Sequence, residues 1–133
     1  MATLCCAGAA VAAGLSRAQY TGTTSERTVV RLRLSSDGHR IAKLRIYYMI
    51  SCDSGETHKT RTDIFGLRIA KDGSFSGRGT YTGAQDSSTN HFKISGVVSS
   101  SRAKGKFSLT AVDQTRTVHC RTGTVTWTAK RVT

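Results

Sequence analysis

Apolar and polar residues alternate along almost the whole chain from Thr28 onward. In the clearest stretch, residues 43–52, every second position carries Leu, Ile, Tyr or Cys. Successive side chains of a strand point to opposite faces of its sheet, so a period of two predicts strands with one buried face. No segment after Ala18 shows the spacing of an amphipathic helix. The pattern therefore predicts an all-β protein.

The alternation predicts eight or nine short strands, most of them joined to the next as sequential hairpins. We expect them at residues 19–23, 28–34, 41–52, 58–69, 75–81, 92–98, 103–109, 118–120 and 124–130. Asp37-Gly38 and Asp72-Gly73 are typical hairpin turns, and polar loops are expected at 83–90 and 113–117. Evenly spaced antiparallel strands of this kind predict a β-sandwich or a small barrel.

The first 18 residues differ in composition from the rest. Residues 4–15 form an alanine-rich apolar run, and Ser16-Arg17-Ala18 follows it. The run resembles the hydrophobic part of a secretory signal and is too short to cross a bilayer. No Lys or Arg precedes it, however, and a short ordered N-terminal helix is the alternative. We therefore expect a signal-peptide-like segment at 1–18, a single β-sandwich domain at 19–133, and a secreted or cell-envelope protein.

The cysteines fit the same expectation. Cys5 and Cys6 lie in the apolar run, which leaves Cys52 and Cys120 in the domain, each at the end of a predicted strand. In an oxidising compartment such a pair predicts one disulfide. The alternative is two unrelated buried thiols in a cytosolic protein. We also expect Trp127 to anchor the core, beside this bridge.

Four glycines occupy inward positions of the predicted strands, opposite aromatic residues. They are Gly77, Gly79, Gly96 and Gly105. Glycine inside a strand often marks a sharp bend or a close approach of another backbone. The strands are therefore expected to be strongly coiled.

The charge is strongly positive: 20 Lys and Arg against 8 Asp and Glu give +12, with an isoelectric point near 10.2. Such a charge favours polyanionic partners such as nucleic acid, an anionic envelope polymer or anionic lipid, although it also serves solubility alone. Only Asp63 among the acids falls within a predicted strand, whereas many bases take outward strand positions. These bases are Arg31, Arg33, Lys43, Arg45, Lys93, Lys104 and Lys106.

The hairpin around Asp37-Gly38 would bring four of these bases onto one exposed face. This predicted platform consists of Arg31, Arg33, Lys43 and Arg45, extended by Tyr47. Cations beside an aromatic ring are typical of surfaces that bind a single-stranded polyanion. The alternative is a charged face that discourages edge-to-edge aggregation.

Catalytic and metal-binding patterns are weak in this sequence. The four histidines, His39, His58, His91 and His119, are scattered, without His-x-His or Cys-x-x-Cys spacing. Three acids that are near in sequence, Asp53, Glu56 and Asp63, leave a carboxylate pair for glycoside hydrolysis open. Acids in exposed turns are usually solvated, however. We expect a non-catalytic protein without metal or cofactor.

Four segments, taken in order, resemble one group of proteins. They are residues 20–24 (YTGTT), 36–41 (SDGHRI), 71–77 (KDGSFSG) and 124–130 (TVTWTAK), with one cysteine after the long strand and one before the last. This order is similar to that of small secreted or envelope-associated β-sandwich proteins of actinobacteria. The resemblance brings no catalytic residues. We expect a binding or structural role at the cell envelope, with an anionic polymer or another protein as partner. The alternative function is a nucleic-acid-binding or virion-associated β protein.

Overall fold

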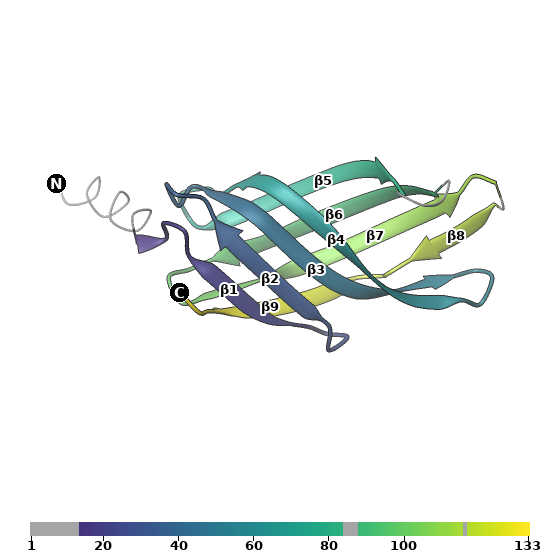
Figure 1. The fold of residues 1–133 in the computed structure, drawn as a ribbon, viewed down its shortest axis with the longest axis horizontal. Helices are drawn as coiled ribbons and strands as arrows, with labels where there is room; N and C mark the ends of the chain where they lie inside the picture. The colour runs from purple at the N-terminus through teal and green to yellow at the C-terminus, as the bar shows by residue number, and fades with distance from the viewer. Residues whose placement is uncertain (1–13, 84–87, 116) are drawn as a thin grey trace.

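The computed structural model describes residues 14–83, 88–115 and 117–133. Within these ranges it contains nine strands and confirms the all-β class (Figure 1). The strands are β1 (Gln19–Thr24), β2 (Val29–Leu34), β3 (Arg40–Cys52), β4 (Thr57–Arg68), β5 (Ser74–Thr82), β6 (Ser88–Val98), β7 (Arg102–Asp113), β8 (Val118–Arg121) and β9 (Val125–Arg131).

The strands form one antiparallel sheet that closes on itself. Neighbouring strands follow the order β4-β3-β2-β1-β9-β7-β6-β5, and β8 pairs with both β3 and β7. The closed part is therefore a six-stranded barrel of β1, β2, β3, β8, β7 and β9, to which β4, β5 and β6 are added. Between β4 and β5 a side-chain contact joins the strands, where the hydroxyls of Thr62 and Tyr81 lie 2.9 Å apart. Of the two predicted architectures, the barrel is the one observed.

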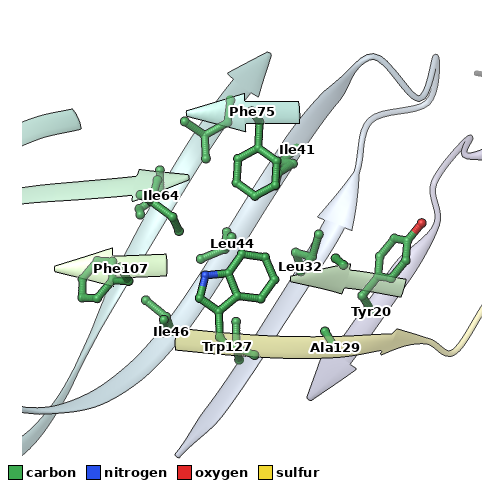
Figure 2. Close-up of a cluster of buried hydrophobic side chains, with 14 of the residues drawn as sticks. Tyr20, Leu32, Ile41, Leu44, Ile46, Ile64, Phe75, Phe107, Trp127 and Ala129 are labelled. Carbon is green, nitrogen blue, oxygen red and sulfur yellow. The ribbon is translucent and has the colours of Figure 1, made fainter. Parts of the chain in front are cut away.

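Inward-facing side chains fill the interior, and a row of four residues shows why the strands coil there. Phe75, Gly96, Gly105 and Trp127 lie opposite one another on β5, β6, β7 and β9. The two rings meet across the two glycines, with centroids 6.1 Å apart (Figure 2). A Cβ added at Gly105 would lie 2.0 Å from the backbone oxygen of Ser95. The expected role of inward glycine, to allow close approach, is confirmed at this row.

Trp127 is a core anchor, as expected, but its predicted position beside the disulfide is wrong. Its register partner Gly105 lies near the start of β7, whereas Cys120 pairs with Ala111 near the end of that strand. Trp127 instead packs against Phe75, and its Nε1 is buried with no hydrogen-bond partner in the described part of the chain.

The predicted disulfide is present and links two neighbouring strands of the barrel, β3 and β8. Cys52 of β3 and Cys120 of β8 are register partners, with Cα atoms 3.9 Å apart. The bridge closes a loop between positions 68 residues apart. In the chain-entropy model such a loop is worth about 4 kcal/mol, because the unfolded chain loses freedom.

Two sequence-based loop boundaries differ from the structure. The loop expected at 83–90 is shorter, because β6 begins at Ser88; residues 84–87 lie outside the described ranges. Asp113, expected in a loop, is the last residue of β7. Within the predicted signal-like segment, residues 1–13 lie outside the described ranges, and Leu15 and Ala18 are buried in the core cluster.

Candidate anion-binding surface

The predicted platform lies on the outer face of β2 and β3. Arg31 is the register partner of Arg45, and Arg33 is the partner of Lys43. The two arginines of β2 are exposed, while the two cations of β3 are half-buried because β4 flanks them. Alternation and one hairpin therefore sufficed to predict which side chains share this face.

Arg45 is already neutralised within the protein. Its Nε and Nη2 donate to the two carboxylate oxygens of Asp63 on β4, at 2.8 and 3.0 Å. These hydrogen bonds lower the pKa of Asp63 and raise that of Arg45. A bidentate pair of this geometry is among the stronger charge-assisted contacts. Arg45 is therefore a poor candidate for binding an external anion.

The aromatic rings near the platform carry cations of the protein itself. The Lys59 ammonium lies 5.8 Å from the centroid of the Tyr47 ring, and the Lys43 ammonium lies 5.9 Å from that of Phe65. A hydrogen bond with Arg61 also lowers the pKa of the Tyr47 phenol. Both rings thus have cation–π partners. Of the platform cations, Arg31 and Arg33 have no ion-pair or cation–π partner among the described residues.

A second cationic region, which the sequence reasoning did not single out, covers the outer face of β5, β6 and β7. A hollow of about 450 Å³ is lined there by polar and charged side chains, namely Ser76, Arg78, Lys93, Ser95, Lys106, Ser108 and Thr124. Next to it, a hollow of about 520 Å³ over β1, β9 and β7 is lined by a similar set, which includes Thr21, Thr23, Ser99, Arg102, Lys104, Thr128 and Lys130. Apart from Val97, the outward-facing residues that line the two hollows are Ser, Thr, Lys and Arg, and no acid lines either hollow. This composition can be recognised in the sequence. How these residues are arranged on the surface depends on the strand register, which cannot be recognised in the sequence.

The three acids considered for catalysis have separate structural partners. Asp63 binds Arg45, and the Glu56 carboxylate lies 3.0 Å from Nε2 of His58. Asp53 accepts a hydrogen bond from the backbone amide of His119 at 3.3 Å. Each carboxylate thus has a local role in holding a strand or turn.

Within the described residues, no group of three or more His, Cys, Asp or Glu side chains is placed to hold a metal ion. The hydroxyl of Thr80 lies 3.0 Å from Nδ1 of His91 on the neighbouring strand.

The described ranges include no helix of the length and hydrophobicity required to cross a membrane.

Comparison with known proteins yields no match: no family model, no curated protein and no solved structure is similar to the chain. The resemblance to actinobacterial envelope proteins stays a prediction.

Proposed function

We propose that the protein is an exported, non-catalytic binding module that holds an anionic polymer on the outer surface of its barrel. One observation carries the proposal. Within the described ranges, five register pairs place two cations directly opposite each other: Arg31–Arg45, Arg33–Lys43, Arg40–Arg68, Arg78–Lys93 and Arg102–Lys130.

Such pairs work against folding. Like charges directly opposite in an antiparallel pair are destabilising. Among the described residues, only Arg45 of these ten cations has a carboxylate partner. A polyanion lying across the strands would relieve the repulsion at several pairs and would release its condensed counterions. Cations that are spaced apart would keep the protein soluble equally well, so solubility alone does not explain why these cations are paired.

The disulfide supports the exported setting. Disulfides form and persist in oxidising compartments and are rare in the cytosol. The Cys52–Cys120 bridge therefore fits a protein that works outside the cytosol, where anionic polymers of the envelope are available partners.

The aromatic rings near the platform already contact lysines of the protein, and this favours an anionic polymer without bases over nucleic acid. Proteins that bind single strands stack bases on exposed aromatic faces. Here Tyr47 and Phe65 have cation–π partners of their own. Among the described residues that line the hollow over β5, β6 and β7, the one aromatic residue is Phe107, whose side chain is buried in the core.

The test separates paired cations from net charge. In the paired-cation variant, Arg33→Gln/Arg78→Gln/Arg102→Gln, one cation is removed from each of three pairs. In the turn variant, Arg17→Gln/Arg27→Gln/Lys71→Gln, the same charge is removed from exposed turn positions. Affinity for dextran sulfate is measured against salt, with neutral dextran as the control polymer.

We expect the paired-cation variant to lower the slope of log affinity against log salt by about one unit for each of its cations that contacts the polymer, and so by up to about three units. The turn variant should leave the slope close to that of the wild type. Equal losses in the two variants, or a wild type that binds neutral dextran equally well, would refute the proposal.

A further inference from the structure

We infer that the hollow over β5, β6 and β7 is a discrete site for a tetrahedral oxyanion, a sulfate or phosphate ester, carried by a hydroxylated polymer. The inference deepens the proposed function and rests on it. It assigns the principal site to the part of the sheet formed by β5, β6 and β7, away from the platform on β2 and β3.

The strand register brings cations and hydroxyls together in this hollow. Arg78 lies opposite Lys93, and Lys93 lies opposite Ser108. On the next outward row Ser76 faces Ser95, and Ser95 faces Lys106. Directly opposed Cβ atoms lie about 5 Å apart and diagonal neighbours about 7 Å apart, so Lys93 is a neighbour of both Arg78 and Lys106. Arg78 and Lys106 lie two strands apart, and their long side chains can reach toward an anion bound beside Lys93.

The shape of the hollow follows from side-chain length. Ser76, Ser95, Ser108 and Thr124 are short, whereas Arg78, Lys93 and Lys106 are long and exposed. The outward-facing residues thus give a floor of hydroxyls with a rim of cations. Because Ile94 and Phe107 are buried in the core, only their backbone contributes to this floor.

These groups are free to receive a ligand. Among the described residues, none of the three rim cations has a carboxylate partner. The acid nearest in sequence to the start of β5 is Asp72, whose carboxylate is engaged by the amide and hydroxyl of Ser74 at 2.9 and 2.6 Å. A sulfate or phosphate ester presents several acceptor oxygens, which matches a site with only donors on its rim and hydroxyls on its floor.

The second hollow lies beside the first, and two neighbouring anion sites suit a ligand that is a chain. Lys106 lines the first hollow and Lys104 lines the second, on adjacent outward positions of β7. Outward positions of one strand are about 7 Å apart, so a polymer with repeated anionic groups can occupy both hollows at once. The threonine and serine hydroxyls that line both hollows suit a polyol or sugar backbone.

Two variants test the site. The hollow variant is Arg78→Gln/Lys93→Gln/Lys106→Gln, and the turn variant described above is its charge-matched control. A Ser95→Ala/Ser108→Ala variant removes hydroxyls without changing charge. Each is titrated, over a range of salt, with dextran sulfate, poly(glycerol phosphate), neutral dextran and oligothymidylate. Circular dichroism and thermal unfolding confirm that each variant is folded.

We expect the hollow variant to lose at least about tenfold in affinity relative to the turn variant for one of the two ester-bearing polymers, and the polymer affected identifies sulfate or phosphate. The serine variant should lose about threefold to tenfold at fixed salt with an unchanged salt slope, because hydrogen bonds and not charges are removed.

Other outcomes overturn the inference in distinguishable ways. If the hollow and turn variants lose equally, or the serine variant binds like the wild type, the site is refuted while wild-type binding still supports the proposed function. A loss confined to oligothymidylate would assign the hollow to nucleic acid and refute the hydroxylated polymer. A wild type that binds none of the polymers would refute both proposals.

Discussion

Replacing Lys93 by glutamine should make the unliganded protein more stable while it weakens polyanion binding. Lys93 lies directly opposite Arg78 on β5 and diagonally across from Lys106 on β7. Glutamine keeps most of the side-chain length and a hydrogen-bonding end but removes the charge. The predicted gain in stability therefore comes from relieved repulsion alone.

The magnitude follows from the register. Two unit charges about 7 Å apart in water repel by about 0.6 kcal/mol, so two neighbours contribute about 1 kcal/mol before screening. At physiological salt the Debye length is about 8 Å, which reduces the sum to about 0.5 kcal/mol. At 1 M salt the Debye length is about 3 Å, and the gain should vanish.

Urea unfolding at low and at high salt measures this gain. We expect Lys93→Gln to raise the free energy of unfolding at low salt and to have no effect at high salt, whereas Lys71→Gln, in an exposed turn, should change it little at either. A double-mutant cycle with Arg78→Gln isolates the pair. The reasoning is refuted if Lys93→Gln destabilises the protein, or if the gain is the same at both salt concentrations.

Three further predictions concern the fold. Replacing both disulfide cysteines by alanine should cost about 4 kcal/mol of unfolding free energy, because the bridge spans 68 positions; a urea midpoint equal to that of the wild type would contradict this. Gly105→Ala should cost about 3 kcal/mol or more in urea unfolding, since the added Cβ would lie 2.0 Å from the Ser95 backbone oxygen. Asp63 has a pKa lowered by Arg45 from its ordinary value of 3.8, so its contribution to stability is complete above that value and is lost as the pH falls through the lowered pKa. The urea midpoint of unfolding, measured between about pH 2 and 5, should therefore fall more steeply with decreasing pH for the wild type than for Asp63→Asn. Parallel curves for the two proteins would exclude this role.

The fold class could be predicted because alternation, turn residues and inward glycines are local signals. Residues 43–52 specify a half-buried strand whatever their partners are. Barrel closure could not be predicted in the same way. It depends on β8, a strand of four residues that pairs with β3 and β7 through contacts far apart in sequence. The position of Trp127 was predicted incorrectly for the same reason, because the register of β9 on β7 decides it.

The candidate site was predictable only in part. The platform depends on one tight hairpin, so the sharing of a face by Arg31 and Arg45 follows from the sequence. The neutralisation of Arg45 by Asp63 requires the register of β3 on β4, which the alternation leaves open. The hollow forms only when β5, β6 and β7 pair in the observed register. The length of the polar loop between β5 and β6 does not specify a turn type, so this register could not be predicted from the sequence.

The most direct test of a discrete anion site is an amide chemical-shift titration of the protein with a short sulfated or phosphorylated oligosaccharide. We predict that the largest shifts fall at residues 76–78, 93–95 and 106–108, which line the hollow. Shifts spread evenly over all exposed cations, or confined to the platform on β2 and β3, would contradict the account.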